Sequence, residues 1–204
     1  MNRYFITGIG TEVGKTIVSA ILTEALQADY WKPVQSGTVE GTDSNSVAGL
    51  ISNTASQFLK EAYSFKEPAS PHLAAALEGV EIDIETVQLP SSSNRNLIIE
   101  GAGGVLVPLN SKHYVIDLAK RFDAEVILVC RNYLGCINHS LLSIDYLRRH
   151  NYKIKGLVLS GDFDPLVRSA IVNYADTPVL AEIKEINEVT KSSIAELARS
   201  VKQF

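Results

Sequence analysis

Short apolar runs alternate with longer amphipathic stretches along the whole chain. The runs at 96–100, 125–130 and 155–160 are almost continuously apolar, which is typical of strands buried on both faces of a parallel sheet. Two shorter runs, at 4–7 and 30–34, predict further strands near the N-terminus. The pattern therefore predicts a mostly parallel sheet.

Helical periodicity fills most of the segments between these runs. Ser70-Pro71 has the chemistry of a helix start, and Asp43 is expected to cap a helix after a loop at 38–43. Further helices are expected over about 15–28, 115–122, 137–149, 166–174 and 190–201.

The alternation of strands and helices continues over the whole length, with no internal repeat or low-complexity linker. It predicts one domain, residues 1–204, with an open, doubly wound α/β fold. Ligands of such sheets bind at the carboxyl ends of the strands.

Composition and charge narrow the class of protein. The 204 residues are 46% hydrophobic, which excludes intrinsic disorder. Nineteen basic against 23 acidic residues give a net charge of −4, so nothing indicates a nucleic-acid or membrane partner. Cys130 and Cys136 are too few for a disulfide scaffold and lack C-x-x-C spacing. With no signal-like or membrane-length apolar run, we expect a soluble cytoplasmic protein.

A glycine-rich segment, GIGTEVGKT at 8–16, lies between the first predicted strand and the first predicted helix. Glycines let backbone N–H groups converge on phosphate oxygens, Lys15 can reach the terminal phosphates, and the Thr16 hydroxyl can hold Mg²⁺. Five residues separate Gly8 from Gly14, instead of the usual four. The alternative is a plain glycine-rich turn, but the strand–loop–helix context favours a P-loop nucleotide-binding fold.

Charged residues follow other predicted strands. Glu100 ends an apolar run and precedes the glycine-rich segment 101–104, so it is a candidate second carboxylate for Mg²⁺. Lys32 follows the second strand and would face the phosphate cleft. Taken singly, Glu100 and Lys32 have the alternative of a solvated strand end, and Asp43 that of a helix cap. Glu12, beside the phosphates, needs a metal, a cationic substrate or the helix dipole to offset its charge.

Five motifs follow one another along the chain: TGIGTEVGKT at 7–16, KPVQSG at 32–37, PASPH at 68–72, EGAGG at 100–104 and LGCINH at 134–139. In sequence and in order they resemble the motifs of the dethiobiotin synthetase family. The resemblance spans roughly residues 3–160, and the five-residue gap in the phosphate loop is itself typical of the family.

The resemblance implies an ATP- and Mg²⁺-dependent ring closure in biotin synthesis. In that reaction 7,8-diaminopelargonic acid takes up CO₂ to form a carbamate, ATP phosphorylates the carbamate, and the second amine closes the ureido ring. A carbamate anion attacking a phosphate brings like charges together, so the barrier is largely electrostatic. The resemblance further implies a homodimer in the cytoplasm.

The resemblance also implies residue roles. Lys32 and Lys15 are the expected catalytic lysines, and Thr16, Asp43 and Glu100 the expected Mg²⁺ ligands. Thr11 and Ser36 would contact the diamine or its carbamate, while Gly135, Cys136, Ile137 and Asn138 would hold its carboxylate tail across a dimer interface. The nucleotide would be bound by Glu12, Val13, Gly14, Lys15, Thr16, Ile17, Asp43, Glu100, Gly101, Ala102, Gly103, Ser160, Gly161, Ile183, Lys184 and Glu185.

Two departures from the family pattern concern ligand recognition. Tyr133 stands where the family carries a lysine before Leu-Gly. Ser160, followed by Gly161, stands in place of an asparagine that contacts the nucleobase, and a segment that is Glu-Ile-Pro-Trp-like in the family here has the sequence EIKE at 182–185. These changes leave the reaction intact and leave the choice of nucleobase open.

Two other classes of protein share the predicted ATP module. Partitioning and septum-positioning ATPases carry a signature lysine where this chain has Gly10, and often a basic or amphipathic surface. Amide synthetases of the cobyric-acid type carry a glutaminase domain, for which 204 residues leave no room. Both alternatives are therefore disfavoured.

Overall fold

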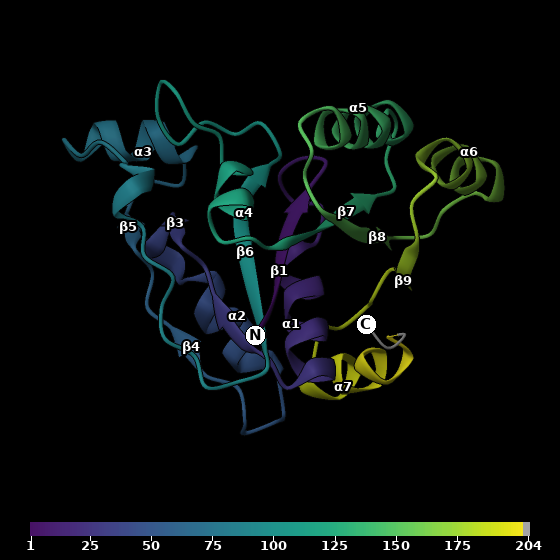
Figure 1. Ribbon diagram of the computed structural model, residues 1–204. Coiled ribbons are helices and arrows are strands. Elements are labelled where there is room, and N and C mark those ends of the chain that lie inside the picture. Colours follow the sequence, from purple (N-terminus) through teal and green to yellow (C-terminus); the bar gives the residue numbers. More distant parts are fainter. Residues whose placement is uncertain (202–204) are drawn as a thin grey trace.

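The computed structural model describes residues 1–201, which form a seven-stranded parallel sheet between two layers of helices (Figure 1). The strand order is β4-β2-β6-β1-β7-β8-β9, and a separate parallel pair, β3-β5, lies beside it. The strands are β1 Asn2–Gly8, β2 Asp29–Trp31, β3 Val34–Ser36, β4 Phe58–Leu59, β5 Tyr63–Phe65, β6 Asn96–Gly104, β7 Glu125–Arg131, β8 Ile154–Ser160 and β9 Val179–Ile183. The predicted fold class is confirmed.

Helices cover both faces of the large sheet. On one face α1 packs against α2 and α7, while α4, α5 and α6 lie on the opposite face and α3 packs on the β3-β5 pair (Figure 1). The helices are α1 Lys15–Leu26, α2 Asp43–Leu50, α3 Pro71–Leu77, α4 Asp117–Arg121, α5 Cys136–Arg149, α6 Pro165–Ala175 and α7 Lys191–Ser200, with 3₁₀ turns η1 Thr38–Glu40 and η2 Ile84–Thr86. Within residues 1–201, no helix is long and apolar enough to cross a membrane.

The continuously apolar runs are explained by burial on both sides of the sheet. Side chains alternate along a strand, so Tyr4 and Ile6 of β1 enter the core beneath α1, and Phe5 enters the opposite core. Ile98 of β6 and its neighbour Ile99 divide in the same way. Burial of each such side chain stabilises the folded state by about 1.5–3 kcal/mol. Because both of their faces are buried, the central strands form a fixed base for the loops at their carboxyl ends.

The prediction of a single strand at 30–34 is wrong, because the segment contributes to two strands in two different sheets. β2 ends at Trp31 and β3 begins at Val34. Pro33 lies between them and has no backbone N–H for a ladder. The break leaves Lys32 at the carboxyl end of β2, at the edge where ligands of such sheets bind.

Other differences are local. Thr42, rather than Asp43, caps α2, because its Oγ1 accepts a hydrogen bond from the Asn45 backbone N–H at 3.1 Å. Asp43 is the first helical residue. Ser70 precedes α3 without a capping bond, and its Oγ lies 3.1 Å from His72 Nδ1. The strands β4, β5 and β9 were not predicted.

Candidate active site

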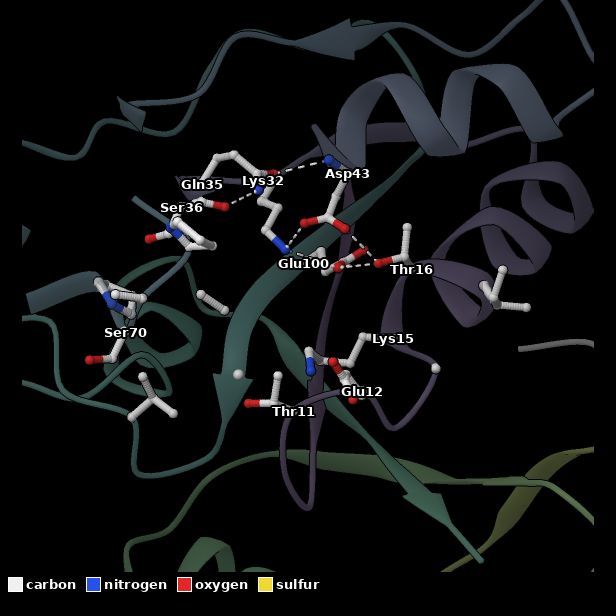
Figure 2. A pocket seen from close by; sticks show the side chains of 18 of the residues that line it. Thr11, Glu12, Lys15, Thr16, Lys32, Gln35, Ser36, Asp43, Ser70 and Glu100 are labelled. Carbon is white, nitrogen blue, oxygen red and sulfur yellow. Dashed lines mark hydrogen bonds and ion pairs between the residues drawn. The ribbon is translucent and has the colours of Figure 1, made fainter. Parts of the chain in front are cut away.

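A cleft of about 710 Å³ opens at the carboxyl ends of the central strands (Figure 2). Its charged residues come from the phosphate loop, the residue after β2, the start of α2, the middle of β6 and the end of β7. The strand expected to end at Glu100 continues to Gly104. The cleft is lined by Thr11, Glu12, Gly14, Lys15, Thr16, Ile17, Lys32, Gln35, Ser36, Asp43, Pro68, Ala69, Ser70, Pro71, Glu100, Ala102, Gly103, Val107 and Arg131.

The segment 8–16 joins β1 to α1, which is the strand–loop–helix context that the sequence predicted. A Cβ at Gly8 would lie 2.4 Å from Val13 Cγ2, so the loop can close only over a glycine. Gly14 caps α1 with φ +94°, a left-handed conformation that favours glycine. The backbone N–H groups at the start of α1 therefore border the cleft, as phosphate binding requires.

Lys15 is folded back over this loop. Its Nζ donates a hydrogen bond to the Gly10 carbonyl oxygen at 3.1 Å. Burial lowers the pKa of Lys15 to about 8, although the negative charge of Glu100 opposes the shift. A phosphate anion near Nζ would stabilise the charged form that burial disfavours.

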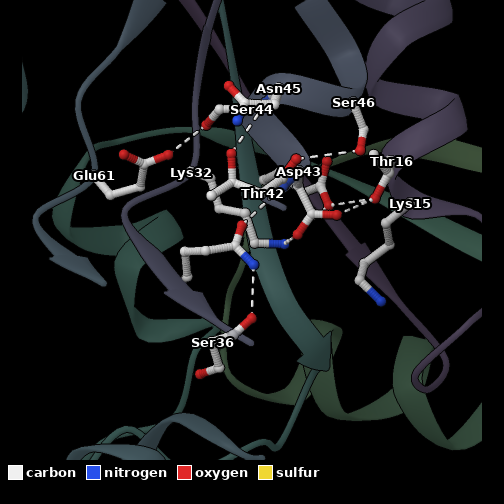
Figure 3. A network of polar contacts seen from close by, with 12 residues as sticks. Lys15, Thr16, Lys32, Ser36, Thr42, Asp43, Ser44, Asn45, Ser46 and Glu61 are labelled. Carbon is white, nitrogen blue, oxygen red and sulfur yellow. Dashed lines mark hydrogen bonds and ion pairs between the residues drawn. The ribbon is translucent and has the colours of Figure 1, made fainter. Parts of the chain in front are cut away.

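Lys32, Asp43, Glu100 and Thr16 form one polar network (Figures 2 and 3). Lys32 Nζ lies 2.5 Å from Asp43 Oδ2 and 3.1 Å from Glu100 Oε1. Thr16 Oγ1 lies 2.8 Å from Asp43 Oδ1 and 3.1 Å from Glu100 Oε1. One ammonium and one hydroxyl thus hold two carboxylates together.

These charges are not solvated strand ends. The Lys32 side chain is 6% exposed and that of Glu100 is 0% exposed. Burial alone would lower the pKa of Lys32, but Glu100 and Asp43 outweigh it and raise that pKa above its usual value. Burial acts to raise the pKa of Asp43, yet Lys32 and two hydrogen bonds hold it below its usual value. Lys32 and Asp43 are therefore both charged at neutral pH, and they form an ion pair.

Neighbouring side chains hold this network in place. Gln35 Oε1 accepts a hydrogen bond from the Asp43 backbone N–H at 3.0 Å, and Gln35 Nε2 donates to the Ser36 carbonyl oxygen at 2.7 Å. The Tyr30 hydroxyl donates to Glu100 Oε2 at 3.0 Å. The buried Ser36 Oγ has no hydrogen-bond partner among the described residues, although Ser36 lines the cleft. A buried hydroxyl without a partner is costly, and a bound ligand would relieve it.

The donors of the network suit a hard divalent cation. Mg²⁺ takes oxygen ligands, usually one or two carboxylates with water and substrate phosphates. Asp43, Glu100 and Thr16 present such oxygens beside the phosphate loop. No group of three or more His, Cys, Asp or Glu side chains suited to a metal occurs within residues 1–201. Two carboxylates and one hydroxyl fit a Mg²⁺ ion that shares its coordination with a nucleotide.

Most of the predicted phosphate, metal and substrate residues line the cleft together. Of the others in this group, Val13 belongs to the loop but has a buried side chain, and Gly101 is packed tightly between Phe5 and Val115. The residues that meet in the cleft are Thr11, Glu12, Gly14, Lys15, Thr16, Ile17, Lys32, Ser36, Asp43, Glu100, Ala102 and Gly103.

The residues expected to bind the nucleobase lie outside the lining of this cleft. Gly161, after β8, donates its backbone N–H to the Ile183 carbonyl oxygen of β9 at 2.8 Å. Ser160 Oγ lies 3.1 Å from the position of a Cβ at Gly14, so the hydroxyl is close to the phosphate loop. Beyond β9, Lys184 and Glu185 are exposed, and Glu185 forms an ion pair with Arg131, Nη2 to Oε1 at 3.0 Å.

The segment expected to hold the substrate tail, Gly135 to Asn138, also lies outside the cleft lining. It begins α5, with Gly135 at φ +105° in the cap position. The preceding Leu134 is fully exposed, and the Tyr133 hydroxyl lies 2.7 Å from His139 Nδ1.

Some residues of the site were missed from the sequence. Gln35 and Ser70 stand inside motifs already noted, so their position within those motifs was the available signal. Arg131 is the last residue of β7, which pairs with β1. Its position at a strand end beside the phosphate loop was the signal that could have placed it in the site. For Tyr30 there was no signal, because an aromatic residue in a strand is typical of a core position.

Solved structures share this fold. A ParA family ATPase from Chlorobium tepidum superposes with a TM-score of 0.62 at 13% identity, covering 97% of this chain and 98% of the other. The septum site-determining protein MinD of Pyrococcus horikoshii, solved with Mg-ADP, gives 0.57 at 16% identity, covering 98% and 95%. At such low identity, these likenesses show the fold alone.

Sequence relatives are much closer. A protein family described as an AAA domain matches residues 2–193. The ATP-dependent dethiobiotin synthetase BioD of Cytophaga hutchinsonii is 50% identical over 204 residues, covering 100% of this chain and 98% of that protein. The proteins of the same name from Christiangramia forsetii and Paramagnetospirillum magneticum are 49% and 42% identical, covering 89% and 97% of this chain and 87% and 95% of those proteins. Identity of this degree over the full length, together with four of the five motifs meeting in the cleft, shows that the chain belongs to the ATP-dependent dethiobiotin synthetase family.

Proposed function

We propose that this protein uses ATP and CO₂ to convert 7,8-diaminopelargonic acid to dethiobiotin. The observation that carries the proposal is the buried Lys32, held between Asp43 and Glu100 beside the phosphate loop of a chain from this family. An ammonium at this place offers positive charge where a carbamate and a γ-phosphate must approach each other.

The proposed reaction has three steps. One amine of the substrate adds to CO₂ and loses a proton, which gives a carbamate anion. A carbamate oxygen then attacks the γ-phosphorus of ATP and releases ADP. The second amine attacks the carbamoyl carbon, the C–O bond to phosphate breaks, and the ureido ring closes with loss of a proton.

Lys15 and Lys32 are the two cations of the cleft to which we assign a role in the reaction. We assign Lys15 to the terminal phosphates of the nucleotide and Lys32 to the carbamate and the transferring phosphoryl group. Positive charge fixed in a buried cleft stabilises developing negative charge without reorganising at the moment of reaction. Thr16, Asp43 and Glu100 would hold Mg²⁺, which would neutralise phosphate charge when bound.

Substrate contacts are assigned to two places. Thr11 and Ser36 line the cleft, and the unpartnered Ser36 hydroxyl supports a contact with the diamine or its carbamate. We assign the carboxylate tail to Gly135, Cys136, Ile137 and Asn138 of a second copy of the chain, because the start of α5 presents backbone N–H groups that suit an anion. The enzyme would then be a homodimer in which each chain, residues 1–204, forms one domain. The use of ATP and the free thiols of Cys130 and Cys136 support a cytoplasmic location.

The test of this function is phosphate release that depends on both co-substrates. The purified protein should release phosphate from ATP only when the diamine and bicarbonate are both present, and mass spectrometry should detect the cyclic urea. A nucleotide-switched ATPase would hydrolyse ATP without either compound. Phosphate release indifferent to both would contradict the proposal.

The dimer gives a separate prediction. If the substrate tail is held by a second copy, a monomer retains its phosphate loop but lacks part of the diamine site. We expect activity per chain to fall steeply when the protein is diluted below its dimerisation constant, with mass photometry as the measure of assembly. Fully active monomers would show that each chain binds the tail alone.

The choice of nucleobase gives another prediction. An asparagine can contact two atoms of adenine at once, whereas the short Ser160 hydroxyl cannot, and it lies close to the phosphate loop. A bidentate base contact is worth about 1–3 kcal/mol of discrimination. We expect kcat/KM for CTP and GTP to lie within about tenfold of that for ATP. Values for the three nucleotides at saturating diamine and bicarbonate measure this, and a preference for ATP above about a hundredfold over both would contradict it.

A further inference from the structure

The two carboxylate oxygens of Glu100 have different partners. Oε1 faces the cleft and lies 3.1 Å from both Thr16 Oγ1 and Lys32 Nζ. Oε2 accepts the hydrogen bond from the Tyr30 hydroxyl at 3.0 Å. The Glu100 side chain is 0% exposed, so water does not compete for these oxygens. The orientation of the carboxylate therefore depends on its protein partners on both sides.

Tyr30 is held firmly in the sheet. Its backbone is in register with Ile98 of β6, two residues before Glu100, and with Phe58 of β4. Its side chain is 0% exposed, and its ring lies 5.8 Å, centroid to centroid, from that of Phe58. The hydroxyl thus approaches Glu100 from a strand that cannot move without disturbing the sheet.

We propose that Tyr30 is a positioning residue, whose hydroxyl holds Glu100 Oε2 and so directs Oε1 toward the bound divalent cation and Lys32. The inference rests on the proposed function, because it concerns the cation assigned to that site. A carboxylate can rotate about its terminal C–C bond, and pinning one oxygen fixes the direction of the other. Hydrogen-bond partners of ligating carboxylates commonly orient them in this way.

The Tyr30 hydroxyl is suited to donate only. Its hydrogen bond runs from the phenol O–H to Glu100 Oε2, and both side chains are buried. Removing the hydroxyl leaves Oε2 buried without this donor.

Mn²⁺ is the probe for the experiment, because its binding can be measured without turnover. We expect Tyr30→Phe to weaken Mn²⁺ binding about tenfold or more, measured by electron paramagnetic resonance on the full chain with a non-hydrolysable ATP analogue. The matched control is Tyr152→Phe, which removes the hydrogen bond from the Tyr152 hydroxyl to Asp117 Oδ1 at 2.6 Å. Neither Tyr152 nor Asp117 lines the cleft, so this variant should bind Mn²⁺ as the parent does.

A second control separates the hydroxyl from the packing of the ring. Phe58→Leu loosens the surroundings of Tyr30 and keeps its hydroxyl, so Mn²⁺ affinity should stay within about twofold of the parent. A tenfold loss in Phe58→Leu, or parental affinity in Tyr30→Phe, would overturn the inference. Glu100→Gln distinguishes a failure of the proposed metal site from a failure of the role assigned to Tyr30. If that variant binds Mn²⁺ normally, the proposed metal site itself fails; if it weakens binding and Tyr30→Phe does not, only the role of Tyr30 fails.

Discussion

Replacing Lys32 by methionine is expected to lower turnover about a thousandfold, near the upper end of what a single lost electrostatic contact costs an enzyme. The variant keeps the length of the side chain and removes its charge. The carbamate and the γ-phosphate would then meet without the buried ammonium between them. Turnover at saturating diamine, bicarbonate and ATP measures the effect. Nucleotide affinity, measured by calorimetry, should stay close to the parent value, because the phosphate loop is unchanged.

Lys32→Arg is the control for charge alone. Arginine carries the same charge on a planar fork, which cannot take the place of a point charge 2.5 Å from one carboxylate and 3.1 Å from another. We expect it to recover only a small part of the lost activity. Turnover of Lys32→Met within about tenfold of the parent would show that Lys32 only balances the buried carboxylates.

Replacing Glu100 by alanine is expected to lower turnover a hundredfold or more and to raise the Mg²⁺ concentration needed for half-maximal rate. The substitution removes one of the two carboxylates proposed to hold the cation, and Thr16 and Lys32 each lose a contact. Initial rates as a function of free Mg²⁺ measure both effects.

Glu61→Ala is the matched control for Glu100→Ala. Glu61 is also close to the network, where its Oε1 accepts a hydrogen bond from Ser44 Oγ at 2.5 Å, but it does not line the cleft (Figure 3). Its loss should leave turnover and Mg²⁺ dependence within about threefold of the parent. Equal behaviour of the two variants would argue against a direct role for Glu100.

The central part of the fold was predictable because four of its strands are buried on both faces. β1, β6, β7 and β8 appear in the sequence as apolar runs, and helical periodicity marks most of the helices between them. The phosphate loop was predictable for a different reason, since its glycines and Lys15 meet a chemical requirement at fixed spacing.

The peripheral strands could not be predicted from such patterns. β4 has two residues and β5 has three, which is too short for any periodicity. β9 lies at the edge of the sheet, and four of its five residues are partly or fully exposed, so it lacks an apolar run. The change of sheet at Pro33 depends on where β5 lies, and that is decided by tertiary packing.

In the site, too, the residues could be predicted from the sequence, whereas the contacts between them depend on tertiary packing. Lys32 and Glu100 were predicted from their places after apolar runs, and Asp43 from the family resemblance. The sequence did not indicate that one ammonium contacts both carboxylates. The hydrogen bond from Tyr30 to Glu100 joins residues 70 positions apart. Such a contact exists only once β2 and β6 have paired.

The buried charges of the cleft have a consequence for the speed of encounter with ligands. Lys15 and Lys32 are balanced by Asp43 and Glu100, and the whole chain carries a net charge of −4. A nucleotide polyanion approaching from solution therefore meets no strong attractive field beyond a Debye length, which is about 8 Å at physiological ionic strength. Capture of the nucleotide depends on short-range contacts made after collision, and its association rate should change little with salt.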